Sequence, residues 1–306
     1  MPTGGALWID ERSSCLSKEV KIRFLRSDGK DFNIDGTDWR ILSNGLEGFG
    51  TYENDITLID NAVGDGGLIA SDRIASKDRT IIARSRDPKW NETLRDKALS
   101  FFNSKFVFSV YLTYQGKTRW FEGKIYKFDL PTENVHRHMT MTITFLCPNP
   151  FLKSYDNFGK NIASVMGMCA FPYLCSVSPG TPRGITGGRF NFAQIIVLEN
   201  DGDVETYCQA VFTAKGEVVN PKLTVNGKYV RVIDTMQLGD VIAIDFTKNP
   251  PTVQKNGVNY IGHCDRTSAF DEMALRVGDS EISFDADTGS NLLDVSIYYN
   301  KLYGAI

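Results

Sequence analysis

The chain has few of the residues that metal and catalytic sites need. It contains three histidines and six cysteines in 306 residues, and no two cysteines form a C-x-x-C pair. It also lacks the G-x-S-x-G, H-E-x-x-H and P-loop motifs. Carboxylates are plentiful, but the sequence places no two of them across a scissile bond. We therefore expect a protein that is not an enzyme, with no catalytic, cofactor-binding or metal-binding residues and no cofactor.

A charge excess and a long apolar run are also missing. The formal net charge is −3 and the pI is about 5.7, which argues against nucleic acid or an anionic membrane as a partner. No apolar run approaches the length of a membrane helix. The first residues, MPTGGALWIDERSS, carry acids where a signal peptide has its apolar core. We expect synthesis in the cytoplasm with reduced cysteines, although whether Cys169 and Cys175 pair stays open.

The composition is that of a globular protein with two cores. Hydrophobic residues make up 42% and charged residues 23% of the chain, and its length suits two domains. A segment rich in Gly, Pro and Ser separates two periodic halves. We expect a first domain over residues 1–154, a connecting segment over 155–190 and a second domain over 191–306.

The clearest strand closes the first half. Residues 138–145 alternate, with Met139, Met141, Ile143 and Phe145 on one face and His138 and three threonines on the other. Prolines at 148 and 150 then end it, because proline cannot donate to a sheet ladder. Further strands are expected at residues 20–25, 32–34, 55–59, 80–84, 106–114 and 118–128.

One helix is expected in this half. Asp87 suits the N-cap and Pro88 the first helical position, and Asn103 suits the end. The stripe that faces the core is expected to consist of Trp90, Leu94, Ala98 and Phe101. The half is therefore predicted to be α+β, a β-rich domain with one packed helix.

Two glycine-rich segments interrupt the strands. Asn44 to Gly50 predicts tight backbone bends rather than a regular element. Gly64-Asp65-Gly66-Gly67 predicts a mobile loop within a polar connection.

The second half predicts a β-sandwich. Asn226-Gly227 and Asn256-Gly257 are strong signals for two-residue hairpin turns. Short strands without a convincing helix surround them. We expect these strands at residues 192–199, 206–213, 222–225, 229–234, 241–246 and 292–299.

Three groups of residues suggest ligand sites, each with a plainer interpretation. His136 and His138 would point the same way on a strand near Cys147, but a polar strand face explains them better than zinc. Asp285 to Gly289 and Asn200 to Asp203 resemble parts of calcium loops, yet Asp and Gly are also turn formers. Three tyrosines near the C-terminus suit sugar stacking or a subunit contact, although packing is the commoner role: Tyr298, Tyr299 and Tyr303.

Taken in order, motifs along nearly the whole chain resemble the distal tail proteins of long-tailed phages, the siphovirus tail-component family. Each motif is weak alone, and their order makes the match specific. In the first half they are Trp39-Arg40-Ile41-Leu42 with Gly45-Leu46-Glu47-Gly48, Gly64-Asp65-Gly66-Gly67 before Arg79-Thr80-Ile81-Ile82, the helix from Pro88 to Asn103, and the closing segment from Phe145 to Phe151. In the second half they are Asn200-Asp201-Gly202-Asp203, Leu223 to Asn226, Gly239 to Asp245 and Val253 to Gly257.

This resemblance implies a structural baseplate protein of the virion tail tip, encoded by a phage or prophage. Family members form a hexameric ring from N-terminal domains, and their galectin-like C-terminal sandwiches point outward. The implied partners are further copies of the chain, the tail tube protein, the tape measure protein, the tail-tip protein and a receptor-binding protein. A carbohydrate-binding sandwich module for host adhesion is the alternative, and a hydrolase of cell-wall glycans ranks third.

Overall fold

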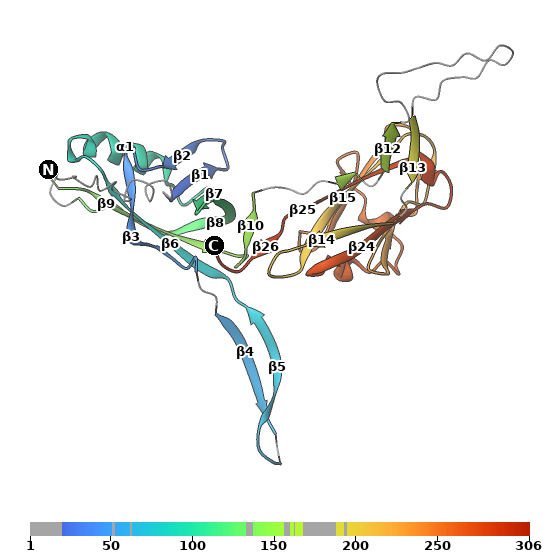
Figure 1. Ribbon diagram of the computed structural model, residues 1–306, viewed down its shortest axis with the longest axis horizontal. Coiled ribbons are helices and arrows are strands. Elements are labelled where there is room, and N and C mark those ends of the chain that lie inside the picture. The colour runs from blue at the N-terminus through green and yellow to red at the C-terminus, as the bar shows by residue number, and fades with distance from the viewer. Residues whose placement is uncertain are drawn as a thin grey trace, which may run out of the picture. The chain divides into compact units, whose positions relative to one another are not determined.

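The computed structural model divides into two compact units (Figure 1). One unit contains residues 1–155 together with 303–306, and the other contains residues 156–302. The last four residues thus pack with the first half, although the sequence suggested the second. The structure describes residues 20–50, 53–61, 63–132, 137–155, 160–161, 163–167, 188–192 and 195–306. For the described residues between 156 and 194, only the backbone is described. Cys15, His136, Cys169 and Cys175 lie outside the described residues.

An antiparallel sheet organises the first unit. In spatial order its strands are β2 (Asp31–Ile34), β1 (Lys21–Arg26), β7 (Val107–Tyr114), β8 (Lys117–Asp129), β9 (Thr140–Cys147), β6 (Lys77–Ser85) and β3 (Trp39–Glu47). Two short strands join it near the end of the unit, where β10 (Leu152–Ser154) pairs with β8 and with β26 (Leu302–Tyr303). A separate two-stranded sheet consists of β4 (Asn54–Asp60) and β5 (Gly67–Ile74).

Strand β9 lies inside the sheet, as its alternation predicts. Met141, Ile143, Phe145 and Cys147 are buried, while the threonines between them are half-buried. The Phe145 ring packs against three other phenylalanine rings of the core, with centroid distances of 5.8–6.0 Å to Phe24, Phe108 and Phe121. These rings belong to β1, β7 and β8 of the same sheet, so the aromatic cluster ties β9 to the neighbouring strands.

The expected helix is present, but its first turn differs from the prediction. Residues Pro88–Trp90 form a 3-10 turn (η2), and α1 continues over Asn91–Phe101. The Asp87 carboxylate accepts a hydrogen bond from the Lys89 amide, which confirms the cap. Leu94, Ala98 and Phe101 are buried as expected. Trp90 is 63% exposed, so its place in the stripe was wrong, because the tighter 3-10 turn changes the direction of its side chain.

Arg26 of β1 caps the other end of this helix. Its Nη1 donates to the carbonyl oxygens of Phe101 at 2.8 Å and Ser100 at 3.1 Å, which have no partner within the helix. Its Nη2 also donates to Asp28 at 2.6 Å, and the paired guanidinium holds the pKa of Asp28 at about 2. One strand residue thereby ties the helix to the sheet.

Arg79 fixes the chain where it leaves the first sheet. This side chain is fully buried between the rings of Phe49 and Phe121, and it donates to the Pro150 carbonyl at 2.5 Å. The backbone amide of Ile306 also donates to the Phe49 carbonyl at 3.1 Å. The exit of the chain and its C-terminal residues are thus held by one aromatic pocket.

The second unit is a β-sandwich. One sheet has the order β11 (Lys160–Asn161), β25 (Leu293–Tyr299), β15 (Thr206–Ala214), β20 (Val241–Asp245), β21 (Thr252–Lys255) and β22 (Val258–Asn259), with β23 (Ala274–Leu275) beside β15. The facing sheet has the order β14 (Ile195–Asn200), β24 (Gly278–Asp285), β17 (Lys222–Val225) and β18 (Lys228–Arg231). Both sheets supply the core, Phe212, Ile244 and Val295 from the first and Leu223, Ile282 and Phe284 from the second.

Short elements complete this unit. They are the pairs β12 (Ala163–Gly167) with β13 (Gly188–Phe192) and β16 (Val218–Val219) with β19 (Thr235–Met236), and the 3-10 turns η3 (Ile261–His263), η4 (Phe270–Glu272) and η5 (Ser290–Leu292). Asn226-Gly227 and Asn256-Gly257 have positive φ at both positions, as hairpin turns of this kind require. The mainly β fold with one helix, inferred from the sequence, is thus confirmed across the described residues.

Candidate assembly surface

The hairpin formed by β4 and β5 extends away from the main sheet of the first unit (Figure 1). It replaces the polar connection expected here, because residues 67–74 form a strand and residues 63–66 lie in the turn at its tip. The strands pair from Asn54 opposite Ile74 to Asp60 opposite Gly67, with a bulge after Thr57. An ion pair of 3.1 Å between Asp55 and Arg73 links them near the base.

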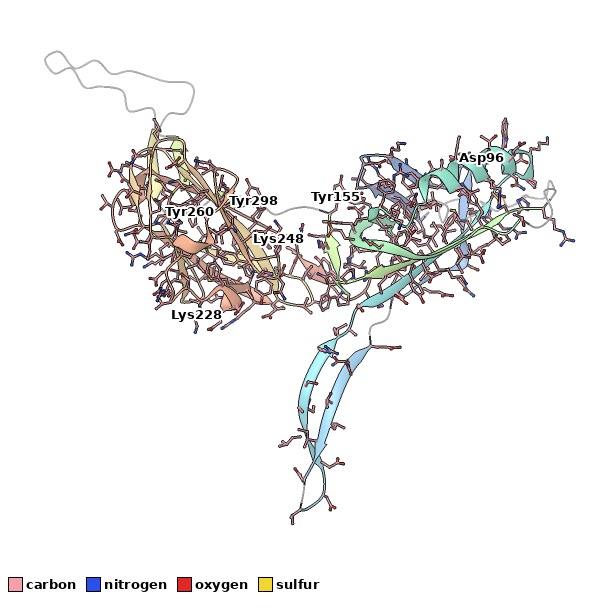
Figure 2. All side chains as sticks on the ribbon, turned by 180° about the vertical axis from the view of Figure 1, so that it is seen from behind. Asp96, Tyr155, Lys228, Lys248, Tyr260 and Tyr298 are labelled. Carbon is pink, nitrogen blue, oxygen red and sulfur yellow. The ribbon has the colours of Figure 1, made fainter. Side chains whose placement is uncertain are left out.

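Apolar side chains lie on both faces of this hairpin. Leu58 is opposite Ile69 and Ile59 is opposite Leu68, and adjacent residues of a strand point to opposite faces. All four are exposed, from 59% for Ile59 to 70% for Leu68. Figure 2 shows the side chains of β4 and β5 pointing outward from the hairpin. Two strands alone cannot bury either face, so the hairpin has no core of its own.

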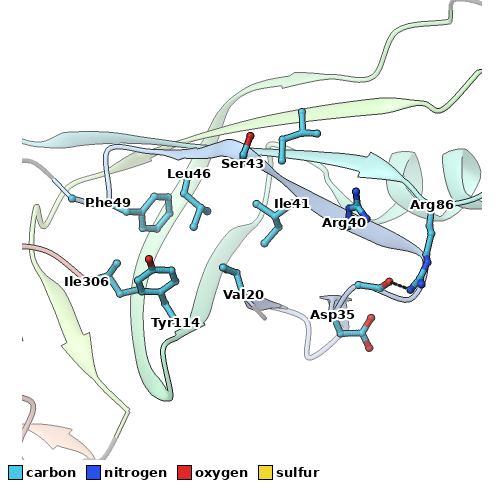
Figure 3. Close-up of a pocket in the computed structure, with 13 residues that line it drawn as sticks. Val20, Asp35, Arg40, Ile41, Ser43, Leu46, Phe49, Arg86, Tyr114 and Ile306 are labelled. Atoms are coloured by element: carbon cyan, nitrogen blue, oxygen red, sulfur yellow. Dashed lines mark hydrogen bonds between the residues drawn. The ribbon is translucent and has the colours of Figure 1, made fainter. Parts of the chain in front are cut away.

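A groove runs along β3, at one edge of the main sheet (Figure 3). It has a volume of about 690 Å³. Apolar side chains line most of it, namely Val20, Ile41, Leu46, Phe49, Tyr114 and Ile306. Its other end carries exposed Arg40 and Arg86 together with exposed Asp35, so basic groups outnumber acidic ones there, and Arg86 donates to the Gly36 carbonyl at 2.7 Å (Figure 3).

The edge strand β3 itself differs from the sequence prediction. Instead of ending in a bent glycine segment, it continues through Asn44 and Gly45 to Glu47, with an irregular register between Ile41 and Leu46. A Cβ on Gly45 would lie 2.4 Å from the Ile82 carbonyl oxygen, so this residue allows the close approach of β6. Among the described strands, β3 pairs with β6 only, so it forms an open edge of the sheet, although its Trp39 carbonyl accepts from the Gly36 amide at 3.1 Å.

The described residues hold no group of three or more His, Cys, Asp or Glu side chains able to bind a metal ion. His138 uses its Nδ1 for a 2.8 Å hydrogen bond with the Ser85 carbonyl. Burial raises the pKa of Cys208 to about 12 and that of Cys264 to about 11, and it also raises the pKa of Cys147. These thiols are therefore protonated at neutral pH, whereas metal ligation needs the thiolate.

The remaining candidates are turns and packed residues. Asp285 to Gly289 joins β24 to η5, and in the other segment the Asn200 side chain accepts from the Gly202 amide at 3.1 Å. Tyr299 is buried, Tyr298 is 37% exposed on the sandwich, and Tyr303 lies under the Arg119 guanidinium at 3.8 Å. No helix of the described residues is long and apolar enough to cross a membrane.

Comparisons with known proteins agree with the resemblance inferred from the motifs. Residues 201–303 match the family model described as the siphovirus-type tail component, C-terminal domain. No curated protein matches the chain. These residues include most of the sandwich, whose turns carry several of the motifs.

Two solved phage structures resemble the chain over most of its length. The SPP1 Dit protein, described as a paradigm of the hub adsorption apparatus in phages that infect Gram-positive hosts, has a TM-score of 0.60 at 11% identity, covering 92% of this chain and 98% of that one. The phage p2 baseplate in its activated conformation with strontium has a chain with a TM-score of 0.51 at 12% identity, covering 94% and 99%. Residues 201–303 are thus similar to the C-terminal domain of siphovirus-type tail components, and the chain shares the fold of SPP1 Dit.

Proposed function

We propose that this chain is a distal tail protein that builds a hexameric ring at the tip of a phage tail. The first unit carries the self-interface. The ring joins the tail tube and the tape measure protein to the tail-tip protein and the receptor-binding apparatus. The family match of residues 201–303 and the fold shared with SPP1 Dit support this function.

The exposed hairpin is the structural observation that most directly supports self-assembly. Each buried leucine or isoleucine side chain contributes about 1.5–3 kcal/mol, and four such side chains of β4 and β5 lie in water. Monomeric proteins rarely expose a projecting apolar surface of this kind, whereas subunit interfaces use it. A second copy of the chain that covers the hairpin would recover this free energy.

The groove along β3 suits the hairpin of a neighbouring copy. Its apolar part matches the leucines and isoleucines of the hairpin, and its basic end matches the acidic hairpin residues. Residues 53–74 contain five acids and a single basic residue, Arg73. Hairpin and groove are different surfaces, so the contact is heterologous, and a ring is the closed form of such an interface.

Reversing the charges tests this pairing. We expect Arg40→Glu with Arg86→Glu to raise the concentration needed for assembly by about tenfold or more, because the groove would then repel Asp60 and Asp65. Asp60→Lys with Asp65→Lys should have the same effect. The protein that carries all four changes should assemble again, measured by light scattering at low salt.

The double change Arg266→Glu with Arg276→Glu is the matched control, since both arginines are exposed on the sandwich. It should leave assembly unchanged. If both double variants with reversed charges assemble normally, the groove does not receive the hairpin. The same conclusion follows if the fourfold variant fails to assemble although every variant keeps the melting temperature of the original protein.

A further inference from the structure

A small polar pocket lies on the outer face of the sandwich sheet that contains β24, β17 and β18. Its volume is about 260 Å³, slightly below the range of about 300–1,000 Å³ for drug-sized ligand sites, so it suits a small molecule or one unit of a polymer. Lys222 pairs with Arg231 on one side and Asp285 on the other, so these three side chains form one row across adjacent strands. Asn220 and Asp287 close one end, and the Tyr229 ring lies in the next row.

The pocket is held rigidly by its surroundings. The loop after β24 is fixed to β16 by two backbone hydrogen bonds, 2.9 Å from Asp287 to Val219 and 3.0 Å from Val219 to Thr288. Asn220 has a φ of +52°, a left-handed conformation that asparagine adopts more readily than most residues, and its backbone amide donates to the Asp234 carbonyl at 2.8 Å. The site is therefore preformed.

The polar groups of the pocket orient one another. The Asn220 side chain donates to Asp287 at 2.7 Å, and Arg231 forms an ion pair with the same carboxylate. The Tyr229 hydroxyl bonds with Thr267 at 2.8 Å, which fixes the ring. Exposed ion pairs contribute only about 0–1 kcal/mol to stability, so the stability of the sandwich does not explain this arrangement.

The chemistry of these groups selects the type of ligand. Lys222 and Arg231 donate hydrogen bonds, Asp285 and Asp287 accept them, and their charges cancel. The two carboxylates would repel an anion, and the two basic groups would repel an isolated cation. Sugar hydroxyls, in contrast, both donate and accept hydrogen bonds. An aromatic ring beside such groups offers a surface for the apolar face of a pyranose. We propose that this pocket binds one ring of a neutral sugar.

Calorimetric titration of the full chain tests the proposal. The probes are glucose, galactose, N-acetylglucosamine and rhamnose, with glycerol phosphate as the anionic probe. We expect saturable, millimolar binding of at least one of the four sugars and none of glycerol phosphate. Tyr229→Ala and Asp287→Ala should each weaken sugar binding by at least about tenfold, which corresponds to about 1.4 kcal/mol.

Three further variants separate a binding role from a structural one. Tyr229→Phe keeps the ring and should keep binding. Tyr298→Ala removes an exposed tyrosine from the sandwich, and Asp279→Asn changes an exposed carboxylate of β24 outside the pocket, so neither should affect binding. Failure of all four sugars to bind, binding of glycerol phosphate alone, or an equal loss in Tyr298→Ala would each overturn the proposal.

Discussion

Replacing Phe145 with alanine is expected to destabilise the first unit by about 3–5 kcal/mol and to abolish assembly. The Phe145 ring is fully buried against Phe24, Phe108 and Phe121, so the substitution removes a large core side chain and leaves a cavity that these rings cannot fill without moving. Denaturant unfolding followed by the fluorescence of the chain measures the loss, and light scattering measures the assembly.

The neighbouring residue provides the matched control. Leu146 belongs to the same strand but points the other way and is 44% exposed, so Leu146→Ala should change the unfolding free energy of the monomer by much less than Phe145→Ala. Equal effects of the two substitutions would mean that the core does not lie on the Phe145 face of β9.

Placing a charge on each face of the hairpin should separate folding from assembly. Leu58→Asp with Leu68→Asp introduces one carboxylate on each face, because Leu58 is opposite Ile69 and Leu68 is opposite Ile59. Within the described chain both leucines are exposed, so the melting temperature of the monomer should stay nearly unchanged. In the assembly the carboxylates would be buried without partners, so the ring should not form.

The sandwich supplies the control for this variant. Leu238 is 76% exposed in the second unit, and Leu238→Asp should leave assembly intact. Light scattering and analytical ultracentrifugation measure both proteins. Normal rings from the hairpin variant would show that β4 and β5 are not part of the self-interface.

The sequence predicted elements whose signal is local. The alternation of β9, the Asp87 cap and the two Asn-Gly turns were predictable because period, cap and turn chemistry depend on neighbouring residues. Strand β5 was missed because its residues, GLIASDRI, follow a glycine cluster and nothing covers their faces, so no polar–apolar alternation marks them. Strand β24 was missed because acids fill its exposed positions and a serine, Ser280, occupies one of its buried positions, which leaves only Ile282 and Phe284 as buried apolar residues.

The candidate sites depended on contacts between distant residues. The sequence predicts the first strand of the hairpin, at residues 55–59, but it indicates a loop after it because Gly64 to Gly67 resembles a mobile segment. Exposed leucines in a strand also cannot be distinguished from buried ones by sequence alone. The pocket proposed to bind a sugar combines Asn220 and Tyr229 with Asp287, which lies 67 residues after Asn220. The sequence marked Asp285 to Gly289 as a turn or part of a calcium loop, and no local signal indicates which side chains of other strands face it.

Electron microscopy of the purified full chain tests the central claim most directly. We expect closed rings with sixfold symmetry in class averages at micromolar protein concentration, and a mass by light scattering of six chains of 34.2 kDa each. Addition of the tail tube protein should increase the fraction of rings. A strict monomer at high concentration, with and without the tail tube protein, would contradict the account.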